Sequence, residues 1–149
     1  MQAQMLAPAA VLIAWSIIVL FWVALTRFPS LSKMGKDAPR PRPGIRGQDL
    51  EGKLPDKVMW KSHNYTHLME QPTIFYPAVI ILAIMGPSAS DVLFAWIYVG
   101  IRIIHSLWQG LVNKLPVRIL LFFLSTLALA KLAICAVMAT LFFNPGVAP

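Results

Sequence analysis

Ionisable side chains recur at helical spacing in the stretch from Trp60 to Pro77. His63, His67 and Glu70 stand at positions i, i+4 and i+7, so an unbroken helix would place them on one face. Ionisable side chains near a membrane-spanning segment are costly to bury, and they usually face a cavity or a partner. This face is therefore a candidate binding site, with a solvated helix end as the simpler alternative.

A second polar face is predicted further along the chain, at Tyr98, Arg102, His105 and Gln109, which follow one another at i, i+4, i+7 and i+11. At a rise of ~1.5 Å per residue, Arg102 lies roughly 12 Å inside the predicted end of its helix, within reach of Glu70. An arginine–carboxylate pair would offset much of the cost of burying either charge. We therefore expect an ion pair between Arg102 and Glu70 with a mainly structural role.

The composition is that of an integral membrane protein. Of 149 residues, 58% are hydrophobic and only 13% charged, more apolar surface than a soluble domain of this length buries. Nine of the 13 Lys and Arg residues fall between Arg27 and Lys61. Such a cluster is typical of a cytoplasmic juxtamembrane loop attracted to anionic lipids rather than of a nucleic-acid-binding surface. We therefore expect both termini outside the cytoplasm and no nucleic-acid partner.

Four segments are predicted to be spanning helices, at about 6–26, 58–85, 91–110 and 117–143. The basic loop 27–57 is rich in proline and glycine, which favours an irregular connection. Pro72 and Pro77 fall inside the second predicted helix, where each frees a carbonyl one turn earlier. The whole chain, 1–149, is thus predicted to be a single all-α transmembrane domain, a four-helix bundle.

The remaining ionisable and sulfur-containing side chains do not define a further site. Lys131 lies within the fourth predicted helix, where it would reach the membrane surface, pair across a subunit interface or line a cavity. Cys135 is the only cysteine, which excludes an internal disulfide. His63, His67 and Glu70 have a spacing compatible with metal ligation, but no H-E-x-x-H signature accompanies them. We expect no metal site.

Three stretches together resemble one family: N-Y-T-H-L-M-E-Q-P-T-I-F-Y, W-I-Y-V-G-I-R-I-I-H-S and N-K-L-P-V-R. They resemble the MAPEG superfamily, membrane-associated proteins of eicosanoid and glutathione metabolism, in a bacterial-type member. The resemblance covers nearly the whole chain. It implies a homotrimer of four-helix subunits, a multi-pass protein of the bacterial inner membrane, with glutathione bound between adjacent subunits near the cytosolic face.

The resemblance also assigns roles to individual residues. The family's helix-two carboxylate falls on Glu70, and its helix-three arginine and histidine fall on Arg102 and His105. The arginine credited with stabilising the glutathione thiolate falls on Arg118, with Pro116 two residues before it. What the resemblance implies is therefore a catalytic role for Arg118 and a glutathione-binding role for the other three residues.

Three positions depart from the family pattern. His63 stands where an arginine is expected, His67 where an asparagine is expected, and Gln109 where a tyrosine is expected. The first and third positions normally help to hold the tripeptide. His63, His67 and Gln109 are thus candidate glutathione-binding residues of altered chemistry.

The family resemblance implies a membrane-bound, glutathione-dependent transferase or peroxidase that acts on a lipophilic electrophile arriving from the bilayer. One alternative is a non-catalytic membrane protein that binds a lipid or a partner protein. Another is an ion or proton pathway through the polar residues, which is less favoured because four short helices offer no evident pore. Glu70, His105 and Arg118 favour the enzyme, whereas the three departures favour the binding protein.

Overall fold

The computed structural model describes residues 1–35 and 43–143, and no residue of these two ranges is in a β-strand. The elements are α1 (Gln2–Met34), a 3₁₀ helix η2 (Gly47–Leu50), α2 (Asp56–Leu68), α3 (Pro72–Met85), α4 (Ala89–Leu111) and α5 (Leu115–Leu141). Four segments are long and apolar enough to cross a membrane: α1, α2 with α3, α4 and α5. The prediction of an all-α, four-helix membrane bundle is confirmed.

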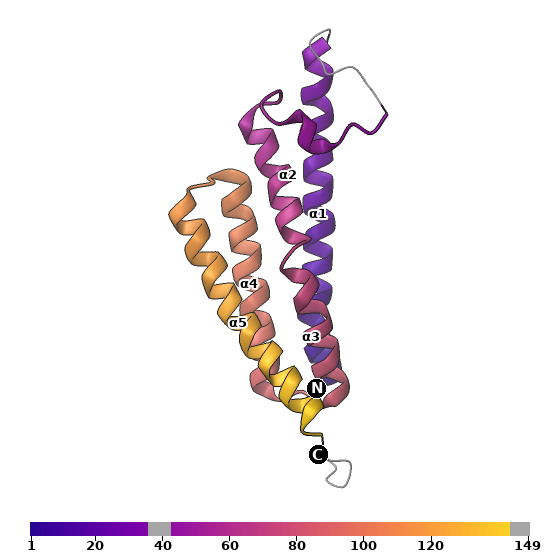
Figure 1. Ribbon diagram of the computed structural model, residues 1–149, viewed down its shortest axis with the longest axis vertical. Coiled ribbons are helices and arrows are strands. Elements are labelled where there is room, and N and C mark those ends of the chain that lie inside the picture. Colours follow the sequence, from indigo (N-terminus) through magenta and orange to yellow (C-terminus); the bar gives the residue numbers. More distant parts are fainter. Residues whose placement is uncertain (36–42, 144–149) are drawn as a thin grey trace.

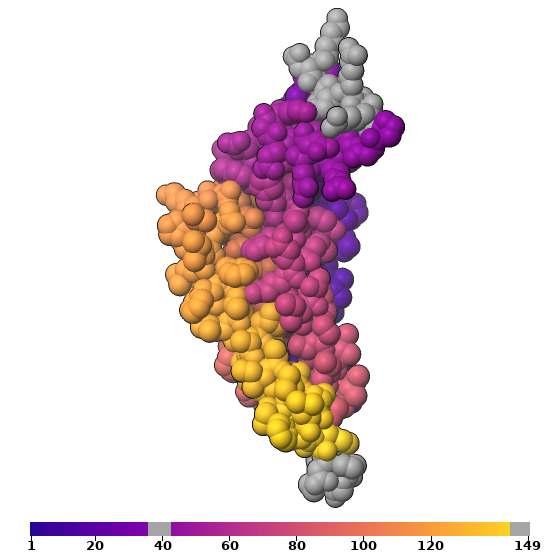
Figure 2. Space-filling model, viewed as in Figure 1, coloured from indigo at the N-terminus to yellow at the C-terminus, as the bar shows by residue number. Residues whose placement is uncertain are grey.

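The helices run up and down along one long axis (Figure 1). The start of α1 and the end of α5 lie at one end of the bundle, and η2 and the α4–α5 turn lie at the other, called here the loop end. The α4–α5 connection stops short of the loop-bearing ends of α1 and α2, which extend beyond it (Figures 1 and 2). This step between the two helical pairs is where the candidate site is found.

The core is built from one apolar stripe of each spanning segment. Met5, Leu12 and Val19 recur every seven residues along α1 and are fully buried. α1 packs against α2, α3 and α4, while α5 packs against α3 and α4. In the centre, the rings of Phe75 and Tyr98 are stacked 4.4 Å apart, which joins α3 to α4.

Polar side chains tie the helices together away from the loop end. The indole Nε1 of Trp15 donates a hydrogen bond to Ser106 Oγ (3.0 Å), joining α1 to α4. Ser88 and Asp91 form a capping box at the start of α4. Asp91 also pairs with Lys131 of α5 at 2.5 Å. The structure therefore gives Lys131 a partner within the same subunit, which is none of the three environments expected from the sequence.

Between the first two spans, the described residues 27–35 and 43–57 form more regular structure than the sequence predicts, and residues 36–42 of the expected loop lie outside the described residues. We expected the first helix to end near residue 26 and an irregular loop over 27–57, but α1 continues to Met34 and η2 follows. Leu50, Leu54 and Met59 form a small buried cluster with side chains from the end of α1. This cluster fixes η2 against the ends of α1 and α2, because its apolar side chains are removed from water there.

The second span is interrupted, and the prediction of one unbroken helix over 58–85 is wrong. α2 ends at Leu68 and α3 begins at Pro72. Proline has no N–H to donate to the carbonyl of Leu68, and it is well suited to a first helical turn. By contrast, Pro77 lies inside α3 without ending it. Met69–Gln71 therefore form a break at the level of the polar side chains.

We predict that residues 44 and 114 are exposed on the same side of the membrane, because both connections lie at the loop end. In a Cys135→Ala background, a cysteine at Gly44 or Lys114 should react with an impermeant maleimide only from the cytoplasmic side, as the basic cluster predicts. A cysteine at Gln2 is the control and should react only from the other side. Labelling of Gly44→Cys and Lys114→Cys from opposite faces would contradict the fold.

Candidate functional site

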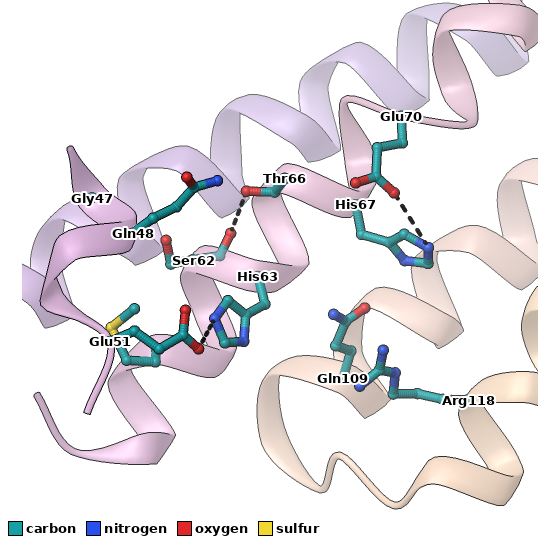
Figure 3. A pocket seen from close by; sticks show the side chains of 11 residues that line it. Gly47, Gln48, Glu51, Ser62, His63, Thr66, His67, Glu70, Gln109 and Arg118 are labelled. Atoms are coloured by element: carbon teal, nitrogen blue, oxygen red, sulfur yellow. Dashed lines mark hydrogen bonds and ion pairs between the residues drawn. The ribbon is translucent and has the colours of Figure 1, made fainter.

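A polar cavity of about 600 Å³ lies at the loop end of the bundle, and it is large enough for a small ligand. It is walled by α2 and η2 on one side and by the α4–α5 hairpin on the other (Figure 3). Five of the seven residues predicted to form the site line it: His63, His67, Glu70, Gln109 and Arg118. The structure thus brings together side chains from α2, the break, α4 and α5.

A second cavity of about 210 Å³ adjoins the first and is mainly apolar. Its walls are His67, His105, Leu115, Arg118, Ile119 and Phe122. Two side chains, His67 and Arg118, line both cavities. They separate a compartment rich in hydrogen-bonding groups from one that suits an apolar ligand.

Arg118 is held in place at this junction by the turn before α5. Its Nη1 donates a hydrogen bond to Asn113 Oδ1 at 2.8 Å. Asn113 itself has a positive φ of 55° in the turn between α4 and α5, a conformation that asparagine tolerates better than most residues. The turn therefore fixes one edge of the guanidinium while the side chain still faces both cavities.

Arg102 and His105 do not line the polar cavity: Arg102 lies beneath its floor, and His105 lines only the apolar cavity. Both are almost completely buried, at 1% and 2% exposure. Arg102 Nη2 donates to the backbone carbonyl of His67 at 2.9 Å. That carbonyl belongs to the last turn of α2. Because the helix is interrupted there, the carbonyl lacks the backbone N–H that would normally donate to it. Arg102 therefore stabilises the broken helix from the inside.

The expected ion pair between Arg102 and Glu70 is not formed. Among the ion pairs of the described residues, Glu70 takes part in one, at 3.8 Å from His67 Nε2, and its side chain is 62% exposed. The expectation assumed that α2 continued through Glu70. Because α2 ends at Leu68, Glu70 is no longer in helical register with the two histidines, and its carboxylate points toward the ring of His67 in the wall of the polar cavity (Figure 3).

His67 is enclosed by aromatic rings on two sides. Its ring centroid lies 5.0 Å from that of His105 and 5.4 Å from that of Phe122, against which it is stacked. Within residues 1–35 and 43–143, two buried polar atoms of cavity-lining side chains have no hydrogen-bond partner, His67 Nδ1 and Gln109 Oε1. Buried polar atoms are normally paired, and because both atoms are shielded from solvent in the free chain, their side chains must shift before either atom can meet a polar group of a ligand.

Sequence reasoning missed part of the site. Gly47, Gln48 and Glu51 line the cavity from η2 and its C-terminal end, and Glu51 Oε1 lies 2.9 Å from His63 Nε2. The spacing of the apolar residues Leu50, Leu54 and Met59 was the available signal that this segment packs against the ends of α1 and α2. Asn113 was also missed as the partner of Arg118, although it opens the N-K-L-P-V-R stretch.

Comparison with known proteins decides the family. The model of the MAPEG family matches residues 5–138, which is most of the chain. The chain belongs to the MAPEG family. At the level of the family, membership implies a membrane protein that acts as a glutathione-related transferase or peroxidase, or in eicosanoid metabolism. Searches of curated proteins and of solved structures found no match.

The break is also tied to α5, and this contact yields a test. Gln71 Nε2 donates to Thr126 Oγ1 at 2.7 Å, and Ser125 Oγ donates to Gln71 Oε1 at 3.3 Å. We predict that Gln71→Leu lowers the free energy of unfolding in detergent by about 1–2 kcal/mol, since it removes both hydrogen bonds between the break and α5, while the Ser125 and Thr126 hydroxyls keep their bonds to the carbonyl of Phe122.

The matched control is the adjacent Glu70→Gln, which should cost less than about 0.5 kcal/mol because its side chain is exposed. Reversible unfolding of both variants in mixed micelles measures the difference. A loss of several kcal/mol in Glu70→Gln would mean that Glu70 does form a buried ion pair, contrary to the structure.

Proposed function

We propose that the protein is a membrane-bound glutathione-dependent transferase, with peroxidase activity as the related reaction, acting on lipophilic electrophiles. The observation that carries the proposal is the position of Arg118 at the junction of the two cavities. Glutathione would occupy the polar cavity as co-substrate, with its sulfur towards Arg118. The electrophile would enter the apolar cavity from the bilayer.

The proposed chemistry follows from the charge on Arg118. A free thiol has a pKa of about 8.5, so only a few per cent is thiolate at neutral pH. A guanidinium beside the sulfur stabilises the thiolate, and each unit of pKa corresponds to about 1.4 kcal/mol. The thiolate then attacks the electrophilic carbon, a carbon–sulfur bond forms, and the leaving group departs with the bonding electrons, as halide does from an aryl halide. The thiol proton has passed to solvent.

The lining of the polar cavity suits a peptide with an ammonium group, two carboxylates and two amides. Glu70 offers a carboxylate at the mouth for the ammonium group, and Gln109 and His67 line the cavity with an amide and an imidazole that would pair with the peptide amides. His63 is a donor for a carboxylate if its present partner moves away. Arg102 and His105 support this lining from below, as positioning residues.

The family resemblance implies a homotrimer, and we propose that the site is completed by a neighbouring subunit. In support, large apolar side chains on α3 and α5 are exposed on the single chain, among them Ile84, Ile134 and Leu141. These faces suit lipid or a second copy of the chain, as expected of an integral membrane protein. Membrane lipids and the lipophilic substrate are the remaining proposed partners.

A non-catalytic lipid- or partner-binding protein is the second candidate. The observation that favours it is that His63, at the position of a family arginine, is engaged by Glu51 of the same chain. Glutathione titration by calorimetry separates the two candidates: binding at millimolar glutathione or below supports the enzyme, and no binding supports the second candidate.

We predict that Arg118→Leu lowers turnover of glutathione with an aryl halide by ten- to a hundredfold, or about 1.4–2.7 kcal/mol of lost thiolate stabilisation. Glutathione affinity should fall much less, because the polar cavity is otherwise unchanged. The matched control is Lys114→Leu, which removes a positive charge from the same turn but lines neither cavity. Equal losses of turnover in both variants would show that the effect is one of general surface charge.

A further inference from the structure

Among the described residues, one side-chain ion pair in the wall of the polar cavity, that between Glu51 and His63, joins the residue after η2 to α2. Glu51 Oε1 lies 2.9 Å from His63 Nε2, and Figure 3 shows the two side chains meeting along the cavity wall. The partner of the imidazole is thus a carboxylate, the same chemical group that glutathione carries at both of its ends. A ligand carboxylate at this imidazole would have to take the place of the Glu51 carboxylate.

The main chain around Glu51 is anchored independently of its side chain. Leu50 and Leu54 are buried on either side of it, at 8% and 4% exposure. Gly47 lies so close to Arg27 that an added Cβ would approach the guanidinium to 2.8 Å, and Arg27 in turn donates to Ser62 in the cavity wall. The Glu51 side chain can therefore rotate away while η2 stays in place.

The contact is weak enough for a ligand to displace. The side chains of His63 and Glu51 are 42% and 59% exposed. Ion pairs with this exposure contribute about 0–1 kcal/mol, because water screens them and ordering two long side chains costs entropy. Arg118 is the permanent cation of the cavity lining, whereas Glu51 and Glu70 are both anions there. A carboxylate of an incoming peptide is repelled by Glu51 as well as excluded from His63.

We propose that Glu51 is a specificity-determining residue that occupies the carboxylate subsite at His63 and competes with glutathione for it. The inference rests on the proposed function, since glutathione is the ligand considered. The chain thus carries its own competitor for this subsite, the carboxylate of the residue that follows η2. Glutathione affinity is then set partly by how often Glu51 leaves His63.

The test is calorimetric titration of the full-length protein, purified in detergent, with reduced glutathione. Glu51→Gln should lower the Kd by about two- to fivefold, the range expected for one exposed charge contact. Asp56→Asn is the matched control, because it removes a carboxylate from the first turn of α2 that does not line the cavity, and it should leave the Kd unchanged. The same Glu51→Gln change in a His63→Gln background should give no gain.

Each outcome separates this inference from the proposed function. If wild type binds glutathione and Glu51→Gln does not tighten binding, the competition is overturned and the proposed function stands. A gain that persists in the His63→Gln background would show repulsion at a distance and would also overturn it. Binding by no variant would overturn both proposals. Tighter binding that requires His63 supports the inference.

Discussion

The break in the second span leaves backbone carbonyls without their helical hydrogen-bond donors, and Arg102 donates to one of these carbonyls. In apolar surroundings an unpaired carbonyl is costly, so a helix interrupted near the membrane needs partners from its neighbours. Arg102 donates to the carbonyl of His67 from below, and Gln71 is held by Thr126 and Ser125 from the side. With these contacts the break is a fixed feature, and it determines where His67 and Glu70 are presented.

The cavity pair depends on that arrangement. Because α2 ends at Leu68, Glu70 reaches the cavity mouth, while His67 remains between His105 and Phe122 at the boundary of the apolar cavity. Arg118 approaches the same boundary from α5, with Asn113 fixing its guanidinium. Polar and apolar compartments therefore meet at one cation, which is the arrangement that a thiol and a lipophilic electrophile require. The proposed function rests on this meeting point more than on any single binding residue.

The sequence predicted the four spans and the buried polar face of α4, because long apolar runs and a period of 3.6 residues are local signals. It failed where the outcome depends on contacts distant in sequence. The sequence does not distinguish Pro72 from Pro77, yet the helix is interrupted only before Pro72. There, Arg102, Thr126 and Ser125 form hydrogen bonds with the residues at the interruption. The expected Arg102–Glu70 pair failed for the same reason, since it assumed helical geometry through the break. The Glu51–His63 contact depends on the folding of η2, which only the spacing of three apolar residues indicated.

In the proposed mechanism, Arg118 stabilises a thiolate at the junction of the two cavities. The most direct measurement is a pH titration of the ultraviolet thiolate absorbance of glutathione bound to the wild-type protein in detergent. If Arg118 stabilises the thiolate, the bound thiol ionises at a pH well below the value of about 8.5 for a free thiol. A midpoint equal to that of glutathione in buffer, measured with the site saturated, would contradict it.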